Sequence, residues 1–142
     1  MRAHNMRDIL SRRMPKWGLV FKLRERLKHV HNKVAERYED GELTVQAAVD
    51  DKILEDMILE ALETAGEPVR WKELKLAFSG IAGEDRLRRA VTRLKATSKV
   101  AELSGTRIAL PKHVSPEMVG KVRNKPVIAE ILKRAEAGGN VG

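Results

Sequence analysis

Cysteine is absent from this chain, which excludes disulfide bridges, thiolate metal sites and cysteine nucleophiles. Aromatic residues are scarce, with two Trp, one Tyr and two Phe, so aliphatic side chains must build most of any core. No apolar run approaches the ~20 residues that a membrane-spanning helix needs. The first thirty residues carry scattered arginines and lack the apolar stretch of a secretory signal. We therefore expect a soluble, cytoplasmic protein.

Motifs that carry catalysis or hold cofactors are missing as well. The sequence contains no phosphate-binding Gly-rich loop, no Gly-x-Ser-x-Gly and no His-Glu-x-x-His. His29 and His31 lie two residues apart on a predicted helix and point in different directions, which does not suit a metal. A group of carboxylates is interpreted as a solvated helix face: Glu55, Asp56, Glu60 and Glu63. We expect no enzyme activity, cofactor, metal or small-molecule ligand.

Charge is abundant and unevenly distributed. The 142 residues carry a net charge of +8, and 34% of them are Asp, Glu, Lys or Arg. Residues 1–38 hold 11 basic and 3 acidic residues, whereas residues 39–66 hold 1 basic and 9 acidic residues. The remaining chain is basic again. Such segregation predicts positive patches that attract polyanions. The many charged residues and the single glutamine, Gln46, also resemble a thermophile's chain.

A long helix is predicted at residues 17–38, within a basic N-terminal region spanning 1–41. Its apolar positions alternate by three and four residues and form one stripe: Val20, Leu23, Leu27, Val30 and Val34. The stripe fits two arrangements equally well. It could pair two chains in a homodimer, or it could pack on the chain's own acidic helix, whose charge is complementary.

Residues 42–111 are predicted to form the central domain. Asp50 caps a helix at 51–65 that Gly66 ends. A short extended segment at 67–71 leads to helices at 71–79 and 84–98, separated by a turn that contains Gly80 and Gly83. Residues 100–103 and 106–110 flank a Ser104-Gly105 turn and predict a β-hairpin.

This order of helix, strand, helix, helix and hairpin resembles the winged helix-turn-helix superfamily over about residues 50–111. The resemblance implies a mainly α fold with a small β-hairpin wing. It also implies that helix 84–98 enters the major groove of DNA and that the hairpin contacts the backbone or the minor groove. A C-terminal tail, 112–142, is predicted to carry a helix at 126–137 that Gly138 and Gly139 end.

Helix 84–98 has an apolar face formed by Leu87, Ala90, Val91 and Leu94. After Glu84 and Asp85 the helix has no acidic residue. Arginine suits this position because its planar fork binds guanine edges and phosphates. The predicted nucleic-acid contacts on or just beyond the helix are Arg88, Arg89, Thr92 and Lys99, flanked by Arg86, Arg93 and Lys95.

Two further basic regions are candidate contacts. The predicted wing carries Arg107, followed by Lys112. A basic N-terminal arm could follow a backbone groove through Arg7, Arg12, Arg13 and Lys16. Trp71 is expected to pack in the core rather than to stack on a base.

These features favour a double-stranded DNA-binding protein, such as a nucleoid-associated transcriptional regulator or chromatin protein. Two other functions stay open. A ribosome-associated RNA-binding protein would account for the long basic N-terminus. A winged-helix interaction module in a transcription or replication assembly would account for the acidic helix and the C-terminal helix.

Overall fold

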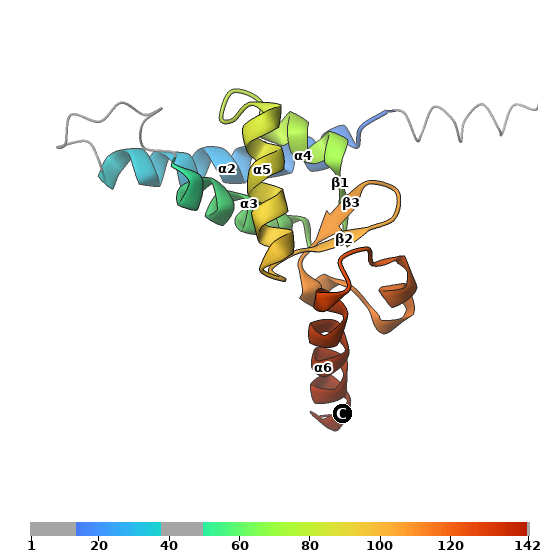
Figure 1. Cartoon of the computed structure of the whole chain (residues 1–142). Coiled ribbons are helices and arrows are strands. Elements are labelled where there is room, and N and C mark those ends of the chain that lie inside the picture. The colour runs from blue at the N-terminus through green and yellow to red at the C-terminus, as the bar shows by residue number, and fades with distance from the viewer. Residues whose placement is uncertain (1–13, 38–49, 142) are drawn as a thin grey trace, which may run out of the picture.

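The computed structural model describes residues 14–37 and 50–141. Its elements are mainly helical, with one small antiparallel sheet (Figure 1). They follow in the order α2 (Trp17–Arg37), α3 (Asp51–Ala65), β1 (Val69–Arg70), α4 (Trp71–Ala77), α5 (Glu84–Ala96), β2 (Ala101–Leu103), β3 (Arg107–Ala109), the 3₁₀ helices η1 (Pro111–His113) and η2 (Pro116–Lys121), and α6 (Pro126–Val141). The predicted mainly α class with a small hairpin is confirmed at this level.

Helix α3 begins and ends where its capping residues predict. The Asp50 side chain accepts a hydrogen bond of 2.8 Å from the backbone N–H of Ile53, which satisfies a free donor at the helix start. Gly66 ends the helix in the left-handed conformation, with φ of +71°, and its N–H bonds to the Leu62 carbonyl. The buried face includes Leu54, Ile58 and Leu62, so α3 lies at the centre of the main core.

Helix α2 packs on its own chain. Val20, Leu23 and Leu27 are buried, and Val30 packs against the same core. The helix rests on α3 and α4. Of the two predicted arrangements, the structure shows the apolar stripe packed on its own chain. A dimer that used the same buried positions would require α2 to detach from α3 and α4. The side chain of Val34 lies outside the described residues.

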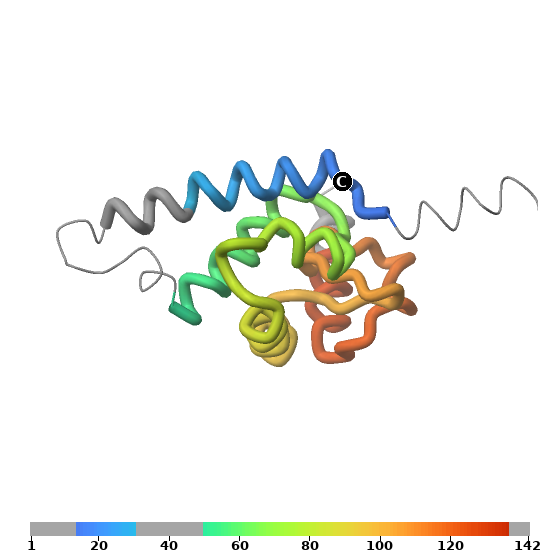
Figure 2. Tube along the Cα trace, turned by 90° about the horizontal axis from the view of Figure 1, so that it is seen from above, coloured from blue at the N-terminus to red at the C-terminus, as the bar shows by residue number. Residues whose placement is uncertain are grey.

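Polar contacts join α2 to both of its neighbours. Arg26 Nε lies 2.6 Å from Glu60 Oε1 of α3, which fulfils the predicted charge complementarity at one pair. Arg24 Nη1 donates a hydrogen bond of 3.1 Å to the Leu76 carbonyl of α4. Helix α5 does not lie on the side of α2: Figure 2 shows α2 and α5 at opposite sides of the molecule.

The sheet has the order β1-β3-β2, with β3 antiparallel to both neighbours. Its hairpin differs slightly from the prediction: Leu103 pairs with Arg107, so three residues form the turn instead of two. Gly105 and Thr106 both have positive φ, which explains the glycine. The sheet also separates two cores, because Ile108 belongs to the main core whereas Leu103 belongs to a second one.

The second core joins the hairpin to the C-terminal segment. It contains the apolar residues Ala101, Leu103, Ala109, Val114, Val122, Val127 and Ile131. Asn124 ties the two parts together: its Oδ1 accepts a bond of 2.8 Å from the Glu102 N–H, and its Nδ2 donates to the Val100 carbonyl at 2.8 Å. The outer side of the hairpin is therefore covered.

Helix α6 continues past its predicted end. The prediction that Gly138 and Gly139 stop it was wrong, because the helix runs to Val141. Glycine inside a helix costs about 1 kcal/mol relative to alanine, but it ends a helix only where the chain turns into the left-handed conformation. The helix points away from the sheet (Figure 1).

Candidate nucleic-acid interface

Helix α5 presents one face to the core and one to solvent. Leu87, Ala90, Val91 and Leu94 are buried, as their spacing predicts. Arg88, Arg89 and Thr92 are exposed on α5, and Lys99 is exposed beyond its end, since the helix stops at Ala96 and not at the predicted residue 98. In the part of the chain that the structure describes, neither Arg89 nor Lys99 takes part in an ion pair. These two cations are therefore available to an external anion.

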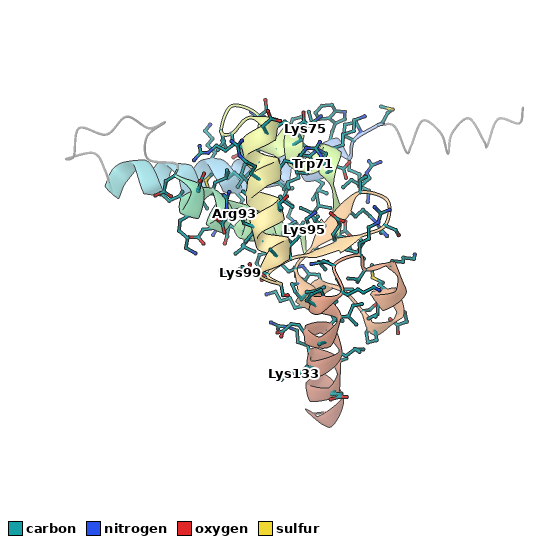
Figure 3. The ribbon with its side chains drawn as sticks, in the orientation of Figure 1. Trp71, Lys75, Arg93, Lys95, Lys99 and Lys133 are labelled. Atoms are coloured by element: carbon teal, nitrogen blue, oxygen red, sulfur yellow. The ribbon has the colours of Figure 1, made fainter. Side chains whose placement is uncertain are left out.

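The flank of α5 that faces α3 is neutralised, which sequence reasoning did not foresee. Arg93 Nε lies 3.0 Å from Glu55 Oε2, and Arg86 Nε lies 3.4 Å from Asp51 Oδ1. Figure 3 shows Arg93 on the α3 side of the helix. Arg86 and Arg93 were predicted as flanking nucleic-acid contacts, but α3 already supplies them with carboxylates.

The start of α5 carries a cluster of charged and aromatic groups. Arg88 Nη2 donates to Glu84 Oε1 at 2.8 Å, and its guanidinium carbon lies 4.9 Å from the centre of the Trp71 ring. Lys75 Nζ is 3.9 Å from the same carboxylate. The hydrogen bond from Arg88 and the charge of Lys75 lower the pKa of Glu84. Arg88 is thus exposed but oriented, because its guanidinium is held between Glu84 and Trp71.

Trp71 connects this cluster to the core. Its side chain is partly buried and packs against the main core, in agreement with the packing role predicted for it. The residue also begins α4 and donates its backbone N–H to the Thr106 carbonyl at 2.8 Å. The hairpin turn is therefore fixed to the helix pair by a direct hydrogen bond.

A hollow of about 250 Å³ lies between α5 and the hairpin. Lys95 lies on the hairpin side of α5 (Figure 3). It is paired with Glu102 of β2 at 2.5 Å. On the hairpin side, Arg107 Nε donates to the Ser104 carbonyl at 3.2 Å. The predicted wing residue thus lines the hollow. Lys112, its neighbour in the prediction, instead lies 2.6 Å from Glu63 of α3 and lowers the pKa of that carboxyl through its hydrogen bond.

Arg123 is a basic residue of this site that sequence reasoning missed. Its backbone N–H donates to the Glu102 carbonyl at 2.7 Å, which places the C-terminal segment along the edge of β2. Its exposed side chain lines the same hollow. No local pattern marks this arginine, because only the tertiary pairing of residues 121–123 with the hairpin brings it there.

The predicted N-terminal arm lies mostly outside the described residues, which include neither Arg7, Arg12 nor Arg13. Lys16 is described and exposed. The chain just before it is held by Arg70, whose Nη2 donates to the Met14 carbonyl at 2.8 Å. The buried Glu73 in turn lies 2.7 Å from Arg70. Residue 14 therefore lies beside β1.

Comparison with family models, with curated proteins and with solved structures finds no match. Among the residues that the structure describes, none of the helices has the length and apolar character needed to cross a membrane. The same residues form no cluster of His, Cys, Asp or Glu suited to a metal ion.

Proposed function

We propose that this protein binds double-stranded DNA, with the exposed face of α5 in the major groove and the hairpin beside it. The observation that carries the proposal is the group of cationic and polar side chains Arg88, Arg89 and Thr92 on α5, with Lys99 just beyond its end, next to a hairpin that bears Arg107. The order of helix, strand, helix, helix and hairpin supports it, since it resembles a winged helix-turn-helix.

The dimensions of α5 suit a major groove. Its 13 residues extend about 20 Å at 1.5 Å per residue, and a groove about 12 Å wide admits one helix. Glu84 and Asp85 lie in the first turn, where the Glu84 carboxylate pairs with Arg88 and Lys75. Binding therefore uses the side of the helix, where Arg89 is exposed, together with Lys99 beyond its C-terminal end.

Electrostatics favours a polyanion on this side. Four of the six basic side chains between residues 86 and 99 lie in ion pairs within the described chain. Most of these pairs are at the surface, where an exposed pair contributes about 0–1 kcal/mol to stability. A DNA phosphate can therefore compete for their arginines, while Arg89 and Lys99 bind without losing a partner.

The test is a fluorescence titration of a labelled duplex with wild type and the double variant Arg89→Ala/Lys99→Ala. Each lost phosphate contact should reduce the slope of log affinity against log salt by about 0.9. The matched control is Lys22→Ala/Lys28→Ala, which removes the same charge from the exposed side of α2. Equal losses in both variants would show that only net charge matters and would contradict the assignment to α5.

A second candidate function, protein interaction, is favoured by one observation on α2. Met14, Trp17 and Phe21 are 56%, 47% and 60% exposed, and the two rings stack with their centres 5.9 Å apart. Exposed apolar groups that gather in this way mark protein interfaces. If wild type binds no duplex, whereas crosslinking to a protein partner is lost in Trp17→Ala/Phe21→Ala, the function would be protein interaction through α2.

A further inference from the structure

The hollow between α5 and the hairpin combines two kinds of surface. Apolar side chains of Trp71, Val91 and Ile108 contribute to its lining. Basic groups surround them, including Arg107 from the hairpin and Arg123 from the C-terminal segment. The lining has one acidic residue, Glu102, which Lys95 already neutralises. The hollow therefore suits a ligand that has an apolar face and a negative charge.

A continuous duplex cannot supply such a ligand. It presents phosphates and sugars along its backbone, while its bases stay stacked inside and show only their edges in the grooves. Phosphate alone would match the basic groups and leave the apolar lining in contact with water. An unstacked base that still carries its phosphate matches both, since bases stack on aromatic side chains and on guanidinium planes.

The size of the hollow limits the ligand further. At about 250 Å³ it lies below the ~300–1,000 Å³ of sites that hold drug-sized molecules. A hollow of this size suits one base with its phosphate better than a longer stretch of strand. The hairpin wall is fixed, because the Trp71 N–H bonds to the Thr106 carbonyl and Asn124 holds β2 against the end of α5.

We infer that this hollow binds a single unstacked nucleotide, with the base against the apolar lining and the phosphate at Arg107 and Arg123. The inference rests on the proposed function, because the expected source of the nucleotide is the protruding end of a DNA strand beside a bound duplex. A free mononucleotide has the same chemistry and is the alternative source. The protein should then prefer a duplex with a single-stranded overhang to a blunt one.

The experiment measures the dissociation constants of one duplex sequence in blunt form and with a short overhang, for the full chain at physiological salt. Wild type should bind the overhang roughly tenfold more tightly, equivalent to about 1.4 kcal/mol. Arg123→Ala should lose most of that preference. Lys121→Ala, an exposed neighbour outside the lining, should weaken both forms by the same factor and keep the ratio.

A second pair of variants fills the hollow without changing the charge. Thr92→Met extends an apolar chain into it and should also abolish the overhang preference. Thr97→Met is the control, because Thr97 makes the same kind of hydroxyl bond to a carbonyl four residues back but does not line the hollow. Thermal melting of each variant checks that it is folded.

The outcomes separate the two proposals. Equal affinity for blunt and overhang duplexes, with Arg89→Ala/Lys99→Ala still impaired, would overturn the inference and leave DNA binding intact. If no duplex binds, the proposed function fails, and titration with dAMP and with inorganic phosphate then tests the hollow alone. Arg123-dependent binding of dAMP would support a free nucleotide as the source. Phosphate binding as tightly as dAMP, or binding of neither, would overturn the inference.

Discussion

Glu55→Gln should strengthen DNA binding, although it removes a native ion pair. Glu55 Oε2 holds Arg93 Nε at 3.0 Å, and the two side chains are 19% and 40% exposed. Arg93 also lines the outer surface of α5 together with Arg88, Arg89 and Thr92. An amide at position 55 has no negative charge and leaves Arg93 only the longer pair with Asp51, at 3.9 Å, so the guanidinium can turn to a phosphate next to the proposed contacts.

The size of the effect follows from counterion release. One added phosphate contact steepens the slope of log affinity against log salt by about 0.9, which amounts to about fivefold tighter binding at 0.15 M salt. The free energy of unfolding should fall by about 1 kcal/mol, because the pair is only partly buried. The affinity and the stability therefore change in opposite directions.

The assay is a salt series of fluorescence titrations with duplex DNA, accompanied by urea denaturation. Asp56→Asn is the control: it removes the same charge from the adjacent position, but Asp56 pairs with Lys52, at 3.2 Å, and not with α5. An equal gain in both variants would reflect net charge alone. An unchanged slope in Glu55→Gln would refute the reasoning that α3 withholds Arg93 from DNA.

Three further predictions concern stability. Leu27→Ala should lower the unfolding free energy by about 2–5 kcal/mol, with a urea midpoint independent of protein concentration, because Leu27 is buried in its own chain; a concentration-dependent midpoint would indicate a dimer seam. Asn124→Ala should cost about 2 kcal/mol and speed hydrogen exchange at the Glu102 amide, whose partner is lost; unchanged exchange would contradict this. Because Arg88 holds the pKa of Glu84 below its unfolded value, the carboxylate stabilises the fold at neutral pH and loses that effect as the pH falls through the folded pKa. Glu84→Gln should therefore lower Tm at pH 7 and lessen its decline from about pH 5 downward; an identical Tm profile would argue against the pair.

Local signals in the sequence were sufficient for most elements. Asp50 and Gly66 fix the ends of α3 through a side-chain cap and a left-handed backbone, and both depend on neighbours in the chain. The apolar spacing of α5 likewise predicts its buried face. The hairpin turn was longer by one residue, because the pairing of Leu103 with Arg107 is decided by the sheet and not by the Ser104-Gly105 dipeptide.

The candidate site was only half predictable, because its charge balance depends on distant contacts. The sequence shows that α5 carries only basic charges after its first turn. It does not show that Asp51 and Glu55, on a helix more than thirty residues earlier, pair with Arg86 and Arg93. Arg123 reaches the hollow only through the pairing of its segment with β2. Periodicity within one helix reports which side faces the core, whereas it carries no information about which cations another element neutralises.

The most direct test of DNA binding by α5 is a titration of the ¹⁵N-labelled protein with a short duplex, followed through backbone amide shifts. The largest shifts are expected at residues 86–99 and 104–107, with residues 20–30 of α2 unchanged. Shifts concentrated around Trp17 and Phe21, or none at stoichiometric DNA, would contradict the proposal that α5 carries the function.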